Sequence, residues 1–153
     1  MEFMGKWSSE AYREECEGYV AANGLTGQVS FIGVLSGPEK FARFAACDIF
    51  CFPSFYDAET FGLVLLEAMQ FGKPVISTHW RGIPSVVDDG RSGFLVPIRD
   101  PGAVTRQLLA LAKDPELRRS MGQEGRRIFE REFTLKAFHR NMEHELLAVC
   151  QER

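Results

Sequence analysis

Two glutamates and the residues between them are the part of this chain best suited to bind a phosphorylated sugar. Glu59 lies in a polar loop, and Glu67 follows with the spacing E-x7-E inside an apolar stretch. Between them lie Phe61, Gly62 and Leu63, where a helix N-terminus is expected. Helix N-termini offer unpaired amides and a partial positive charge to phosphates, and carboxylates accept hydrogen bonds from sugar hydroxyls. The segment therefore predicts a cradle for a sugar nucleotide.

The position of the two glutamates on their elements decides whether they can share one ligand. On a single helix they would differ by roughly 80° in direction. The turn residues 53–58 indicate instead that Glu59 precedes the helix and faces the crevice at the carboxyl end of a sheet, which Glu67 reaches from within the helix. In the alternative interpretation, Glu67 is a surface residue of an amphipathic helix. The apolar residues around Glu67 weigh against that alternative.

The rest of the chain predicts an α/β fold, with a Rossmann-like parallel sheet and helices on both faces, because short apolar runs alternate with longer amphipathic ones. Strands are expected at 2–4, 29–32, 49–52, 75–77 and 94–96. Helices are expected at 9–22, 39–46, 61–70, 82–87, 101–113, 115–130 and 135–151. We expect residues 1–153 to form one domain. A complete Rossmann-like half would open with a further strand–helix unit, so we interpret the chain as an apparent fragment that lacks this first unit.

Composition and charge exclude several functional classes. The formal net charge of -3 argues against a nucleic-acid-binding surface, and no apolar run approaches the ~20 residues that span a bilayer. The four cysteines form no CxxC pair and no metal-ligand spacing, which favours a reduced, cytoplasmic protein. No G-x-G-x-x-G follows a strand, so a dinucleotide oxidoreductase is disfavoured.

Four other polar residues are weaker candidates for ligand or metal binding. Asp57, next to the central motif, is a better additional contact than any histidine. His79 lies in a loop, where we favour a structural or surface role. His139 and His144 do not have the spacing of a zinc pair.

The last predicted helix carries an apolar stripe at helical spacing. We expect its first half to pack in the core and the remainder to be exposed, where it could drive self-association. The stripe consists of Leu135, Phe138, Met142, Leu146 and Val149.

The run PSFYDAETFGLVLLEAMQFGKPVIST closely resembles the donor-binding signature of retaining glycosyltransferases of the GT-B fold, specifically family four (glycosyl transferases group 1). Further blocks at 27–33, 46–50, 82–96 and 114–133 resemble that family in the same order. The resemblance implies the C-terminal, donor-binding half of a GT-B fold, with the first strand–helix unit missing.

The resemblance also implies roles for individual residues. Glu59, the residue assigned to catalysis, would contact hydroxyls of the transferred sugar, and Glu67 would bind the ribose. Backbone amides near the helix start would hold the diphosphate, and the loop after the second strand would frame the base. The diphosphate residues are Phe61, Gly62 and Leu63, and the base-framing residues are Val34 and Leu35.

The implied reaction moves a sugar from a UDP- or GDP-linked donor to an unknown acceptor, with retention at the anomeric carbon. No cofactor and no metal are expected. The enzyme would stabilise the charge that develops on the leaving diphosphate through an oxocarbenium-like transition state.

Several family features are missing from this chain. They are the basic pair of the first unit and the N-terminal acceptor domain. Ser85 stands where the family often has glutamate, and residues 79–81 replace a glycine-rich run. We therefore expect weak nucleotide binding and no sugar transfer by the chain alone, and we leave membrane association of the parent enzyme open.

Two other functions remain alternatives at this point. The chain could be a non-catalytic nucleotide-sugar-binding or regulatory module. It could also belong to a sugar-nucleotide epimerase, although the additional acid/base set of such an enzyme is not found.

Overall fold

The computed structural model describes residues 1–151 and divides into two compact units, with the boundary between Arg43 and Phe44. The first unit contains two strands, one helix and the start of a second helix. These elements are β1 (Glu2–Met4), α1 (Glu10–Ala22), β2 (Ser30–Gly33) and α2 (Gly37–Ala46), which crosses the boundary.

Strand pairing and aromatic contacts hold the first unit together. β1 and β2 pair in parallel, and the rings of Phe3 and Phe31 on facing positions stack at 5.4 Å between centroids. Trp7 packs on Phe31 at 4.8 Å, and the hydroxyl of Ser9 caps α1 by accepting the amide of Tyr12. None of residues 1–43 is fully buried, so this unit has no core of its own.

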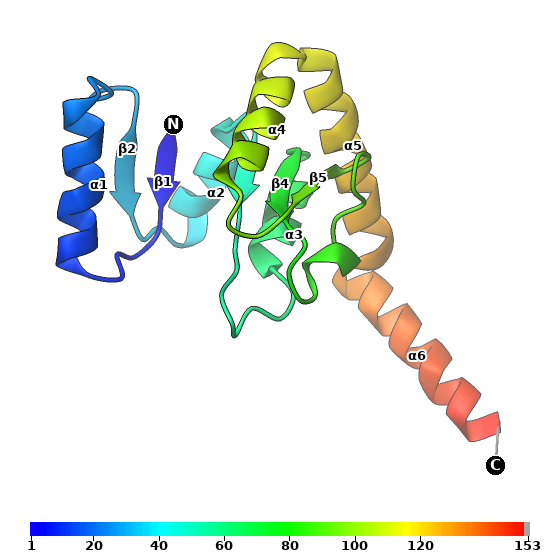
Figure 1. The fold of residues 1–153 in the computed structure, drawn as a ribbon. Coiled ribbons are helices and arrows are strands. Elements are labelled where there is room, and N and C mark those ends of the chain that lie inside the picture. Colours follow the sequence, from blue (N-terminus) through cyan, green and yellow to red (C-terminus); the bar gives the residue numbers. More distant parts are fainter. Residues whose placement is uncertain (152–153) are drawn as a thin grey trace. The chain divides into compact units, whose positions relative to one another are not determined.

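The second unit is built on a three-stranded parallel sheet in the order β3-β4-β5, with α4 and α5 packed beside it (Figure 1). Its elements are β3 (Phe50–Phe52), α3 (Leu63–Gln70), β4 (Val75–Thr78), the 3₁₀ turn η1 (Ile83–Ser85), β5 (Gly93–Val96), α4 (Pro101–Lys113), α5 (Pro115–Glu132) and α6 (Leu135–Gln151). Since the strands are parallel, the loops that follow all three begin at one edge of the sheet.

Apolar side chains pack on both faces of this sheet. Ile76 of β4 forms a buried cluster with Leu111 of α4 and Met121 of α5. On β3, the ring of Phe50 lies 5.2 Å from that of Phe44, which also stacks on Phe71. The sheet is therefore fixed from two sides, and its carboxyl edge is a rigid base for the loops that leave it.

The predicted elements are confirmed, with shifts at their ends that have local causes. α3 begins at Leu63, two residues later than predicted, because Gly62 has a φ of 75° and does not continue a helix. The helix predicted at 82–87 is reduced to η1, and α5 extends two residues further, to Glu132.

The apolar stripe of α6 is the main error of the fold prediction. Leu135 and Phe138 are 72% and 55% exposed, so the expected core packing of the first half is wrong. Ala137 is the buried residue of this stretch. α6 extends away from the rest of the second unit (Figure 1), which leaves the stripe on its surface. Within residues 1–151, no helix has both the length and the apolar character needed to cross a bilayer.

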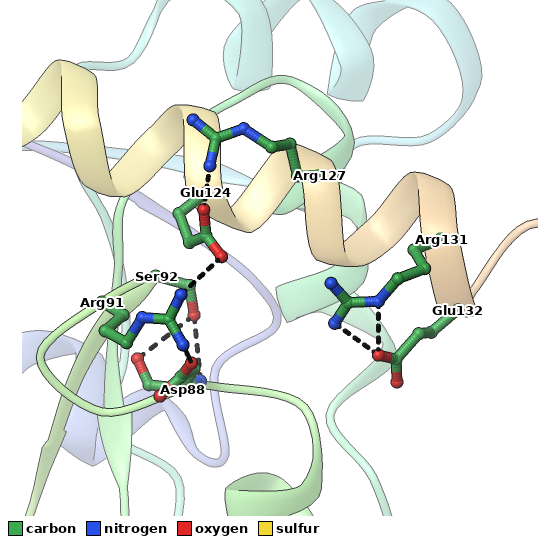
Figure 2. Close-up of polar contacts among 7 residues, drawn as sticks. All are labelled: Asp88, Arg91, Ser92, Glu124, Arg127, Arg131 and Glu132. Carbon is green, nitrogen blue, oxygen red and sulfur yellow. Dashed lines mark hydrogen bonds and ion pairs between the residues drawn. The ribbon is translucent and has the colours of Figure 1, made fainter.

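A network of charged side chains anchors the loop that leads into β5 (Figure 2). Arg91 contacts Asp88 at 3.0 Å and Glu124 of α5 at 3.3 Å, and Glu124 also pairs with Arg127. The hydroxyl of Ser92 accepts the amide of Asp88 at 2.9 Å. These charges are therefore paired with one another, and Glu124 links the loop before β5 to α5.

Candidate functional site

The loop 53–62 leaves β3 at the carboxyl edge of the sheet and leads directly into α3. Side chains at the end of β4 hold its first residues in place. The hydroxyl of Ser77 donates to the carbonyl of Phe52 at 2.7 Å, and the hydroxyl of Thr78 donates to the carbonyl of Ser54. Since Ser77 and Thr78 are fully buried, these hydrogen bonds are shielded from water.

Glu59 lies before the helix, as predicted, and its carboxylate turns back toward the start of α3. Its Oε1 accepts the backbone N–H of Gly62 at 2.9 Å. Its own backbone N–H donates to the carbonyl of Tyr56 at 3.0 Å, which closes a turn. The half-buried side chain is therefore in contact with the helix start and does not stand free over the sheet edge.

Gly62 combines a left-handed backbone with close packing. A Cβ at this position would lie 2.9 Å from Cδ1 of Leu65 and 3.6 Å from Cγ1 of Ile83. Its carbonyl accepts the amide of Leu65 at 2.8 Å. The amide of Gly62 already donates to Glu59. The next two amides, of Leu63 and Val64, lie in the first turn of α3 and have no acceptor within the helix, so they are the donors available to an anion.

Glu67 lies one helical turn after Leu63, so the two residues share a face of α3. Leu63 is 70% exposed and Glu67 is half-buried. The other faces of α3 are packed in the core through Leu65, Leu66, Ala68 and Met69. The helix therefore presents Glu67 on the same side as its own N-terminal residue, as a shared ligand would require.

The loop after β4 braces the Glu59 loop through contacts that the sequence analysis did not predict. The indole N–H of Trp80 donates to the carbonyl of Tyr56 at 2.9 Å. Arg81 lies over the Trp80 ring and faces Asp57 at 3.9 Å. A Cβ on Gly82 would lie 2.0 Å from the carbonyl oxygen of Thr60.

A signal for this brace was present in the sequence. Trp80 follows a buried strand, where a large ring with one N–H needs an acceptor, and the next glycine allows two backbones to approach closely. His79, by contrast, has an exposed side chain, in keeping with the surface role predicted for it.

Two arginines flank the Glu59 loop. Arg81 follows β4, and Arg99 follows β5 and lies over the ring of Phe55 at 5.2 Å. Both have left-handed backbones, with φ of 46° and 58°. The Arg81–Asp57 pair is widely exposed and is worth little as a salt bridge by itself.

One cysteine, Cys51, lies in the strand that leads into the loop 53–62. Burial in β3 raises the pKa of the Cys51 thiol from its ordinary 9.0 to about 11, so it is protonated at neutral pH. Among residues 1–151, no group of three or more His, Cys, Asp or Glu side chains could hold a metal ion.

The predicted base-framing residues belong to the first unit. Val34 and Leu35 follow β2, where Gly33 has a φ of 70°. Val34 is 70% exposed and Leu35 is half-buried. Val34 and Leu35 therefore belong to the first unit, whereas Glu59, Gly62 and Glu67 belong to the second.

Comparisons with known proteins show the family of the chain. The family described as glycosyl transferases group 1 matches residues 2–128. N-acetyl-alpha-D-glucosaminyl L-malate synthase of Bacillus anthracis is 47% identical over 70 residues, which are 46% of this chain and 18% of that protein. Phosphatidyl-myo-inositol mannosyltransferase of Mycobacterium leprae is 34% identical over 115 residues, which are 75% of this chain and 29% of that protein.

A solved structure shows the same fold. The Alr3699/HepE protein of Anabaena, crystallised with UDP-glucose, superposes with a TM-score of 0.81 at 23% identity, over 96% of this chain and 40% of that protein. The chain therefore spans less than a third of the two curated relatives and less than half of this structure.

Proposed function

We propose that this chain, which belongs to the glycosyl transferases group 1 family, binds the nucleotide-sugar donor of a retaining glycosyltransferase. The α/β fold predicted from the sequence is confirmed by the structural similarity. The retaining outcome, the donor and the residue roles are parts of the proposal.

The observation that carries the proposal is the junction between the loop 53–62 and α3. There, the carboxylate of Glu59 contacts the Gly62 amide, the helix start follows, and Glu67 lies on the same helix face as Leu63. This order of a carboxylate, free amides and a second carboxylate matches a sugar, a phosphate group and a ribose in sequence.

In the proposed complex, Glu59 binds hydroxyls of the transferred sugar and Glu67 binds those of the ribose. The amides of Leu63 and Val64, with the helix dipole, stabilise the negative charge on the leaving diphosphate. A phosphate could also replace Glu59 at the Gly62 amide, since both are anionic acceptors. Val34 and Leu35 frame the base through their backbone, and no metal takes part.

The acceptor site is proposed to belong to a larger protein, because the relatives matched here are more than three times longer than the matched segments. The isolated chain should bind donor weakly and transfer no sugar. We also propose a reducing, cytoplasmic setting, which the cysteine pattern supports. The exposed stripe of α6 would allow self-association or contact with that larger protein.

Calorimetric titration with UDP, UDP-glucose, GDP and GDP-mannose tests the proposal. We expect saturable binding of one nucleotide family that is unchanged by EDTA, and a raised melting temperature with the same ligands. Absence of binding to all four would contradict donor binding, loss of binding in EDTA would contradict the metal-free site, and sugar transfer by the isolated chain would contradict the need for a larger protein.

A further inference from the structure

Trp80 is connected to Glu59 by an unbroken series of hydrogen bonds. The carbonyl of Tyr56 accepts the indole N–H of Trp80 at 2.9 Å and the backbone N–H of Glu59 at 3.0 Å. The carboxylate of Glu59 then accepts the amide of Gly62 at 2.9 Å. One carbonyl therefore joins the loop after β4 to the turn that sets the direction of Glu59.

The loop that carries Trp80 is itself firmly placed. Trp80 follows Thr78, which is fully buried at the end of β4, and the amide of His79 donates to the carbonyl of Val96 in β5 at 2.9 Å. Two residues after Trp80, the backbone of Gly82 packs closely against the carbonyl of Thr60, near the end of the loop 53–62. Trp80 thus connects the end of β4 to the irregular loop 53–62 through its hydrogen bond to Tyr56.

The Trp80 ring is also covered on one side. The guanidinium of Arg81 lies 5.3 Å from its centre, within the range of a cation–π contact. The ring is thus in contact with Arg81 and its N–H with the carbonyl of Tyr56.

We propose that Trp80 is a positioning residue that orients Glu59 toward the sugar of the donor. The inference rests on the proposed function and assigns the loop after β4 a role in recognising the sugar rather than the nucleotide. The hydrogen-bond series runs from Trp80 through Tyr56 and Glu59 to the Gly62 amide, so we expect Trp80 to affect the sugar contact of Glu59 more strongly than nucleotide binding.

The test compares two ligands on the same variant. Trp80→Phe keeps a ring and removes the N–H. We expect its affinity for UDP-glucose, or for GDP-mannose if the chain prefers guanosine, to fall by about fivefold, while its affinity for UDP or GDP stays within about twofold. A general loss of structure would weaken both ligands alike, so the ratio of the two affinities separates positioning from stability.

Two controls make the result specific. Thr78→Val removes the hydrogen bond to Ser54, at the start of the loop, and should lower the melting temperature without changing the affinity ratio. In a Glu59→Ala background, Trp80→Phe should have no further effect on the ratio, because the residue through which it acts is gone.

The outcomes separate the two proposals. If the unmodified chain binds none of the nucleotides, the proposed function fails. If it binds them but Trp80→Phe leaves the ratio unchanged, or Thr78→Val changes it equally, or the effect persists without Glu59, donor binding stands and the positioning role of Trp80 is refuted.

Discussion

The two loops assigned to the donor are built very differently. The Glu59 loop follows a strand of a buried sheet and is held by hydrogen bonds from Ser77, Thr78 and Trp80. The Val34 loop belongs to a unit without a fully buried residue, and Val34 itself is largely exposed. The two loops therefore start from different supports: side-chain hydrogen bonds from the neighbouring strand fix the Glu59 loop, whereas the unit of the Val34 loop has no fully buried residue.

The largest expected effect is on the proposed ribose contact of Glu67, which follows the Glu59 loop on α3. Glu67→Ala should weaken nucleotide binding by about 100-fold or more and abolish the ligand-induced rise in melting temperature, because hydrogen bonds to a carboxylate are lost. Thermal shift with UDP and GDP measures this. Glu143→Ala on the exposed face of α6 is the matched control and should retain the full shift. A full shift in the Glu67 variant would overturn the ribose assignment.

Cysteine reactivity tests whether the two units differ in protection. At pH 8, Cys51 should be alkylated about 100-fold more slowly than an unshifted thiol, because its pKa is raised to about 11. Cys16, on α1 of the first unit, should react sooner. Mass spectrometry after timed iodoacetamide treatment follows both sites, and equal rates would show that β3 is not protected as described.

The same pKa shift gives a pH dependence with a definite sign. The folded protein holds the Cys51 proton more tightly than the unfolded chain does. The stability that this provides is complete below pH 9.0 and is lost as the pH rises toward about 11. In Cys51→Ala, the fall of stability over this interval should be smaller, as measured by urea denaturation.

Two glycines with similar backbones offer a matched comparison of packing. Gly62→Ala should cost about 2 kcal/mol of unfolding free energy, since strain adds to a Cβ contact of 2.9 Å with Leu65. Gly33 has a φ of 70°, but no atom lies within 4 Å of a Cβ added there. Gly33→Ala should therefore lower the unfolding free energy by about 1 kcal/mol, from backbone strain alone. Urea denaturation followed by circular dichroism measures both. Equal costs would mean that the Glu59 loop is no more tightly packed than the Val34 loop.

The smallest effect is expected in the exposed loop. Val34→Ser should change the unfolding free energy by less than about 0.5 kcal/mol, and nucleotide affinity by less than about twofold, because the proposed base contacts use the backbone. Calorimetric titration of the variant checks the second value. A tenfold loss of affinity would instead assign the Val34 side chain to the base.

Local sequence patterns were sufficient to predict most of the fold. Ser9 and the prolines at the starts of α4 and α5 mark helix boundaries through chemistry that acts within a few residues. The position of Glu59 before α3 followed from turn residues in the same way. The late start of α3 required the backbone angle of Gly62, which sequence indicates only as an option that glycine allows.

Features that depend on contacts between distant segments could not be predicted. The Trp80–Tyr56 hydrogen bond joins residues 24 positions apart, and neither residue type specifies the other. The exposure of Phe138 likewise depends on what packs against α6, because helical spacing defines an apolar stripe but not its partner. The Glu59–Gly62 contact is local, yet it appears only once the backbone of the turn is known.

The most direct test of the central claim is an NMR titration of the ¹⁵N-labelled chain with the preferred sugar nucleotide. We expect the amide signals of Gly62, Leu63 and Val64 to shift most, together with that of Glu67 and, more weakly, those of the Val34 loop. Saturable binding that leaves the amides at the start of α3 unchanged, or that shifts only signals of α6, would contradict the claim.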